Sequence, residues 1–355
     1  MTSTIEKEQS WRLAITNSNN GYLDTDEIET RFRVALVRKE TFQKHIQAHI
    51  AAGKESNYTA SGIASFKEHI AELDRYMQFL INEIANFPPL PVLPPPQPLI
   101  KISGVIEEVT FTKAMACFDA EAYSTVQEEL EQKRNRDNMG AVFAMLAQAM
   151  NDSPIHARVN DGKANKLKCL YVEGKVSGKS FSGWFGMTNI RVGDYVEMAV
   201  MSKGDRYLAY AIINTTLATI SMTPKCCEGK SLHTFTYIAL FSFFVVLIPF
   251  LYPLLYTSSF PKALCTYIIV SLGVSVGLYK KTYSKQGVHF ELYGRIAKAL
   301  NFPKGESFDL LTHAGKISKK KREAGEIPPR EEGQPPMPQG SVKGKNYHLE
   351  FFYYY

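Results

Sequence analysis

The chain has 355 residues, of which 45% are apolar and 21% are charged. This composition excludes a disordered or collagen-like chain and leaves room for two or three folded units. The net charge is +6, but the usual aromatic and glycine motifs of nucleic-acid recognition are missing, so we expect no nucleic-acid partner.

The N-terminal quarter indicates helices followed by a stiff linker. Residues 1–25 are polar and are expected to be disordered. Residues 26–87 carry apolar side chains three and four positions apart, with a polar break near Gly53, which predicts a helical hairpin. The proline-rich residues 88–98 then favour a polyproline II spacer between domains, and a docking site for a partner is the alternative.

Residues 99–224 change to the alternating pattern of short strands. Glycine-containing turns separate them, as at Gly193-Asp194. A stretch at 119–152 is rich in helix formers and is expected to be a helical insertion. The pattern predicts a small closed β-barrel of OB or SH3-like type, and an α+β fold class.

Two charge-free runs follow the barrel, Phe235–Tyr256 with 22 residues and Ala263–Tyr279 with 17. A helix needs about 20 apolar residues to cross a bilayer, so we interpret both runs as transmembrane helices that form a hairpin. Lysines lie before the first run and after the second. By the positive-inside rule both termini are then cytoplasmic.

The two runs differ in the residues that govern helix packing. Pro249 and Pro253 are expected to kink the first. The second contains small residues that permit close helix contact, within the hairpin or, as an alternative, between copies of the chain. These are Ser271, Gly273, Ser275 and Gly277.

The C-terminal part is basic. Residues from 280 to the last carry fourteen Lys or Arg and eight Asp or Glu, which accounts for the whole net charge. Residues 285–313 are expected to form an amphipathic helical segment, and 314–355 a basic, proline-rich tail. Such charge beside a membrane span indicates contact with anionic lipid.

Catalytic and metal sites have little support in the sequence. His45 and His49 have helical i, i+4 spacing but lack a third ligand of the HExxH kind. Cys226 and Cys227 are expected to be unmodified thiols, with acylation as the alternative. The run from Gly174 to Lys179 lacks phosphate-loop spacing and predicts a turn. We therefore predict no enzyme, no cofactor and no metal.

Several short motifs occur together between residues 101 and 233. They are a Lys101-Ile-Ser-Gly104 strand, Gly183-Trp184, a Gly193-Asp194-Tyr-Val-Glu turn, and Cys226 with His233. In this order, ahead of apolar runs, they resemble a bacterial family labelled as type VI secretion system effectors. Lys225, Glu228, Asn214 and Ala218 depart from the residues expected there.

The resemblance implies a membrane-inserting antibacterial effector that perturbs the target membrane without catalysis and has a cognate immunity protein as partner. The alternative is an immunity or accessory protein that binds a cognate toxin. Either would lie in the bacterial inner membrane, in contact with the lipid bilayer, and homo-oligomers remain open.

Overall fold

The structure is a computed structural model that describes most of the chain. The described residues are 4–51, 57–94, 97–118, 166–227, 229, 238, 260–326 and 352–355. Two compact units are present. The first consists mainly of residues 1–90, and the second comprises 91–112 and nearly all residues after 162.

The first unit contains helices α1 (Thr4–Asn17), α2 (Thr25–Ala51) and α3 (Asn57–Ala85). Helices α2 and α3 pack along each other, with the rings of Phe42 and Phe66 5.5 Å apart. Trp11 of α1 lies edge-on to Tyr76 of α3 at 5.2 Å. The segment 1–25, expected to be disordered, therefore contains a helix, because one aromatic side chain docks it on α3.

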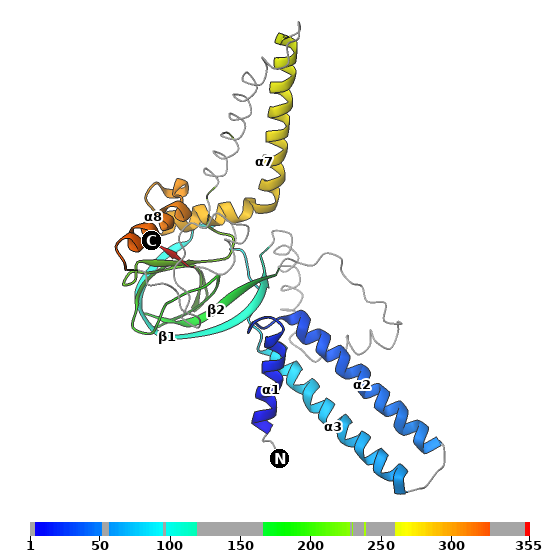
Figure 1. Ribbon diagram of the computed structural model, residues 1–355. Coiled ribbons are helices and arrows are strands. Elements are labelled where there is room, and N and C mark those ends of the chain that lie inside the picture. The colour runs from blue at the N-terminus through cyan, green and yellow to red at the C-terminus, as the bar shows by residue number, and fades with distance from the viewer. Residues whose placement is uncertain are drawn as a thin grey trace. The chain divides into compact units, whose positions relative to one another are not determined.

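The second unit is built on a seven-stranded sheet, drawn from cyan to red in Figure 1. Its strands are β1 (Ile100–Cys117), β2 (Lys166–Val176), β3 (Lys179–Phe185), β4 (Tyr195–Lys203), β5 (Arg206–Asn214), β6 (Thr219–Met222) and β7 (Tyr353–Tyr354). Strand β1 is long and curved (Figure 1).

Five of these strands form a closed ring. Strand β1 lies between β2 and β4, and β3 pairs with β5 in parallel, which gives the order β1-β2-β3-β5-β4 around the ring. This is the closed five-stranded topology of OB-type barrels. Its interior is filled by apolar side chains, among them Ile106, Phe181, Phe185 and Met198.

Two glycines allow neighbouring strands of the ring to approach. A Cβ atom at Gly174 would clash with the carbonyl oxygen of Glu108 on β1, and one at Gly183 with that of Ala209 on β5. Both glycines are required where backbones come close. Gly183 therefore helps to close the ring at the β3–β5 junction.

A second apolar core covers the outer face of β4, β5 and β6. The C-terminal half of α7 (Phe260–Ala299) contributes Leu292, Tyr293 and Ile296, which are at most 2% exposed. The short helix η2 (Gly305–Ser307) and α8 (Leu310–Glu323) follow. Leu310 and Ala314 of α8 belong to the same core.

The predicted membrane hairpin is wrong. In the part of the chain that the structure describes, no helix has the length and apolar character needed to cross a bilayer. Ala263–Tyr279 is only the first part of α7, which continues through Lys280 and Lys281 to the core described above. The membrane fold class, the two spans and the inner-membrane localisation are corrected accordingly. Apart from residue 238, the first run, Phe235–Tyr256, lies outside the described residues.

Two further sequence expectations concern the insertion in the barrel segment and the proline-rich linker before it. The helical insertion at 119–152 lies outside the described residues. The proline-rich segment is not a free spacer over its whole length, because Leu93 packs against the second core and the Tyr210 hydroxyl donates to Val92 O at 3.1 Å. Arg295 also donates to Pro94 O, at 3.4 Å.

Candidate binding groove

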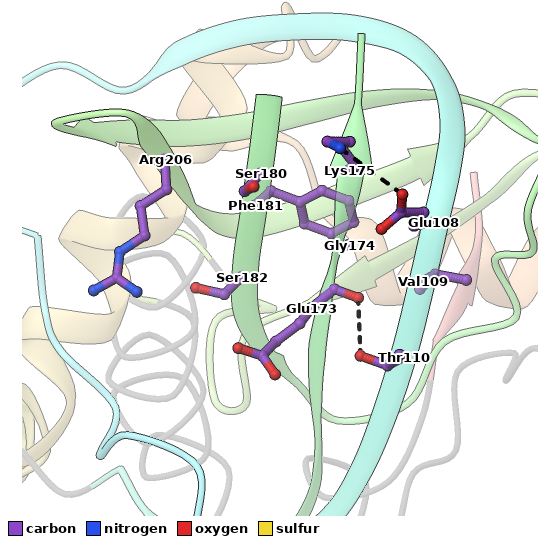
Figure 2. A pocket seen from close by; sticks show the side chains of 10 residues that line it. All are labelled: Glu108, Val109, Thr110, Glu173, Gly174, Lys175, Ser180, Phe181, Ser182 and Arg206. Atoms are coloured by element: carbon purple, nitrogen blue, oxygen red, sulfur yellow. Dashed lines mark hydrogen bonds and ion pairs between the residues drawn. The ribbon is translucent and has the colours of Figure 1, made fainter. Parts of the chain in front are cut away.

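A groove of about 290 Å³ lies on the barrel where β1, β2, β3 and β5 are neighbours. Figure 2 shows the side chains that line it. They are Glu108, Val109, Thr110, Glu173, Gly174, Lys175, Ser180, Phe181, Ser182 and Arg206. Seven of these ten residues are polar, and they come from four different strands.

Strand pairing explains why these side chains meet. On the β2–β3 hairpin, Glu173 is opposite Ser182 and Lys175 is opposite Ser180. Because residues two apart on a strand face the same side, all four project from one face. The hairpin turn follows at Ser177 and Gly178, both with positive φ, as predicted for this run. Glu107 accepts a hydrogen bond from Gly178 N at 2.8 Å.

Charges of both signs line the groove. Lys175 Nζ lies 3.8 Å from Glu108 Oε1, and the Thr110 hydroxyl donates to Glu173 O at 3.4 Å (Figure 2). In the parallel register of β3 and β5, which closes the ring, Ser180 is the Cα partner of Arg206. This register brings the Arg206 cation to the groove. Two carboxylates and two cations therefore lie within one groove, so their charges balance.

The aromatic ring in the groove lining and two rings beside it on β2 and β3 are covered. Phe181 in its lining is 2% exposed, and neighbouring Tyr171 and Trp184 are 4% and 6% exposed, with ring centroids 5.1 Å apart. Burial raises the pKa of the Tyr171 hydroxyl, and its hydrogen bond with Ser182 partly offsets that rise. None of these rings presents an open face on which a base or a sugar could stack.

The described lining residues offer charged and hydroxyl groups for binding and include no pairing of a nucleophile with an imidazole. Among the described residues that line the groove there is no histidine and no cysteine. Its serines, Ser180 and Ser182, have no imidazole beside them there to act as a general base. Nor do the described residues contain a group of three or more potential metal ligands.

The first motif residues lie on the β1–β4 seam, away from this groove. Lys101 Nζ forms an ion pair with Glu197 Oε2 at 2.7 Å. Gly104 is opposite Val196 in the register, and a Cβ atom there would clash with Ser177 Oγ. These residues therefore join strands of the barrel.

The Gly193-Asp194 turn is attached to the same seam. Gly193 has φ +91° and donates to Ile106 O at 2.8 Å. One oxygen of the Asp194 carboxylate accepts from Arg191 N at 2.8 Å and from Asn214 Nδ2 at 2.7 Å. Asn214, at a position where the family resemblance leads one to expect an arginine, fastens this turn to β5.

The other motif residues are not brought to this seam. Trp184 lies on β3 beside Tyr171, and Cys226 belongs to the second core with an exposure of 1%. Burial raises the pKa of the Cys226 thiol, which disfavours the reactive thiolate and acylation. His233 lies outside the described residues. The motif residues therefore form no single site among the described part of the chain.

The residues expected to pack in a membrane have other surroundings. No described atom lies within 4 Å of a Cβ atom built at Gly273 or Gly277, so the helix contact predicted there is not seen in the described residues. Ser275 is 7% exposed. Ser271 lies in α7, but its side chain, like Pro249 and Pro253, is outside the described part.

His45 and His49, weighed above as metal ligands, both lie near Phe66, with ring centroids 5.8 Å and 6.0 Å from that of Phe66.

In the same unit a hollow of about 410 Å³ lies between the three helices. Its lining is largely aromatic, with Trp11, Phe42 and Tyr76. On its rim Lys7 pairs with Glu72 at 2.9 Å.

Comparison with known proteins supplies no relative. The chain matches no family model, no curated protein and no solved structure. The resemblance to secretion-system effectors therefore stays a prediction.

The groove could not be predicted from the sequence. Its polar lining comes from four strands, and Glu108 and Arg206 are 98 positions apart in the chain. The available signal was the polar-apolar alternation Lys179-Ser-Phe-Ser182, which marks a strand with one polar face. Which strands lie beside that face depends on the β3–β5 pairing, which no local pattern contains.

Proposed function

We propose that this protein is a non-catalytic binding protein whose barrel recognises an extended peptide segment of a partner protein. The observation that carries the proposal is the groove with charges of both signs: the Lys175–Glu108 ion pair, with Arg206 and Glu173 in the same lining. Partner binding was the alternative function in the sequence analysis. Membrane perturbation is not proposed.

The charges favour a peptide over a nucleic acid. Proteins that bind single-stranded nucleic acids use a positive groove and exposed aromatic rings. Here Glu108 and Glu173 would repel phosphates, and Phe181 is buried. A peptide with one acidic and one basic side chain would complement the cations and the carboxylates of the lining, and such complementarity gives specificity.

The spacing of the groove suggests the pattern of the peptide. Glu173 and Lys175 are two residues apart on β2, which corresponds to about 6.6 Å along a strand. Side chains two apart on an extended ligand have the same spacing and point to the same side. The preferred ligand therefore carries opposite charges at positions i and i+2.

Fluorescence anisotropy with labelled octapeptides tests this proposal. The probes are Gly/Ser peptides with a Lys-x-Glu or Glu-x-Lys core, matched peptides without charge, an oligothymidine and a chitin hexasaccharide. We expect one charged peptide to bind the full chain best, and Arg206→Glu to weaken it about tenfold or more, equivalent to about 1.4 kcal/mol. Arg191→Glu makes the same charge change outside the groove and should leave binding unchanged. Preference for the oligothymidine or the hexasaccharide, or no effect of Arg206→Glu, would contradict the proposal.

A further inference from the structure

The last residues of the chain form an added strand on the sheet. Strand β7 pairs with β6 in antiparallel register, with Tyr353 opposite Ile220 and Tyr354 opposite Thr219. Tyr355 N also donates to Ala218 O at 2.9 Å. The basic tail predicted from the sequence thus ends in a strand that covers the β6 edge of the sheet.

This strand is held by side chains as well as by its backbone. Phe352, Tyr353 and Tyr354 are 1%, 5% and 8% exposed. The Tyr355 ring lies 5.1 Å from that of Phe302. Lys321 of α8 places its Nζ 5.5 Å from the centre of the Tyr354 ring, within cation–π distance.

The surface that receives β7 is also held by other elements of the second unit. Strand β6 is hydrogen-bonded to β5 on its other side, and Phe302, Phe308 and Leu310 belong to the second core. Its Tyr293 hydroxyl donates to Phe308 O, which fixes the loop after α7. Strand β7, in contrast, consists of two residues and follows α8 only after residues 324–352.

We propose that the β6 edge, the loop at 302–308 and α8 form a strand-acceptor site for extended, tyrosine-rich segments, which the chain fills with its own residues 352–355. Addition of a strand to a sheet edge obtains affinity from main-chain hydrogen bonds and specificity from the side-chain pockets. A partner's segment of the same aromatic character competes with the tethered one. This site is separate from the β1–β2–β3–β5 groove and does not depend on its function.

A peptide with the sequence of residues 350–355, Glu-Phe-Phe-Tyr-Tyr-Tyr, tests the site in trans. It is labelled at its N-terminus and amidated at its C-terminus. We expect it to bind a chain truncated after Glu350, and to bind the full chain at least tenfold more weakly, because a tethered segment competes at an effective concentration of about millimolar. The matched control is the same peptide with an N-methyl group on Tyr355, which removes the donor to Ala218 O and should not bind.

A second variant protects the test against poor folding of the truncated chain. Tyr354→Lys in the full chain keeps its length and weakens the docked strand, so it should bind the peptide better than the unchanged chain does. Equal binding to all three proteins, or equal binding of the N-methylated peptide, would show non-specific adhesion and overturn the proposal. Absence of binding to the truncated chain and the variant, both with native circular dichroism, would also overturn it.

Discussion

Lys101 Nζ lies 2.7 Å from Glu197 Oε2, and this ion pair links β1 to β4 diagonally across the seam of the barrel. Both residues belong to motifs that the sequence analysis singled out, at positions 96 residues apart in the chain. Their side chains are 33% and 28% exposed. The pair therefore connects two of the motif residues directly, with a role in holding the barrel together.

Removal of this pair should have a small effect. Because partly exposed pairs are screened by water and salt, Lys101→Met should lower the free energy of unfolding by less than about 1 kcal/mol. Urea titration followed by circular dichroism measures this loss, and a double-mutant cycle with Glu197→Gln gives the coupling. A coupling above about 3 kcal/mol would show that the seam depends on this pair.

Asn214→Asp should make stability depend on pH. Asn214 is 1% exposed, and its amide donates to the Asp194 carboxylate at 2.7 Å. A second carboxylate there would raise the pKa of one of the two by like-charge repulsion. The folded state then binds a proton that the unfolded state releases, so the variant should be least stable at pH 7 and recover as the pH falls.

Asn214→Ala provides the control for this variant. It also removes the acceptor for Thr216 N and Leu217 N, so it should lose about 1–3 kcal/mol. It adds no carboxylate, and its loss relative to the unchanged chain should stay nearly constant between pH 7 and pH 5. The same recovery in both variants would contradict the like-charge explanation.

Trp184→Ala should destabilise the barrel strongly. The indole was expected to be buried, which the structure confirms with an exposure of 6%, and it contacts Tyr171 and Phe118. Loss of a buried tryptophan costs about 3–5 kcal/mol, mainly from the cavity that remains. Trp184→Phe keeps part of the volume and should lose less. Urea unfolding of the full chain, followed by circular dichroism, measures both losses. An alanine variant with the same free energy of unfolding as the unchanged chain would contradict the prediction.

Alkaline pH should weaken the second core. Burial raises the pKa of Tyr210 well above the ordinary value of about 10. Below that pH the hydroxyl is neutral in both states. Above it the unfolded chain releases the proton while the folded chain keeps it, so stability should fall as the pH rises from 9 to 11.

Tyr210→Phe isolates this contribution. The variant loses the hydrogen bond to Val92 O, which should cost about 1 kcal/mol at pH 7. Its further loss between pH 9 and pH 11 should be smaller than that of the unchanged chain. Equal losses over this interval, measured by urea titration, would assign the alkaline effect to other groups.

Local patterns predicted individual strands and turns better than they predicted how far the helices extend. The alternation around Ser180 and Phe181 and the Gly193 turn are properties of a few neighbouring residues, and the structure contains both. The sequence predicts that a membrane span ends at the interruption formed by Lys280 and Lys281. This interruption lies inside α7, because lysine is a good helix former and does not end a helix.

Features that depend on distant pairing could not be predicted. The groove requires β3 beside β5, and the strand-acceptor site requires Tyr353 beside Ile220. Neither contact leaves a local signal, since a polar strand face and an aromatic tail are compatible with many partners. The tail appeared basic and proline-rich because its few docked residues contribute little to composition.

The most direct test of peptide recognition by the groove exchanges the charges of the Lys175–Glu108 pair. Glu108→Lys combined with Lys175→Glu keeps the ion pair and reverses its direction. Anisotropy titrations then give the ratio of dissociation constants for the Lys-x-Glu and Glu-x-Lys octapeptides. We expect the unchanged chain and Arg191→Glu to share one preference, and the exchanged variant to reduce this ratio about tenfold or reverse it. A ratio that is the same in all three proteins would contradict peptide recognition by the groove.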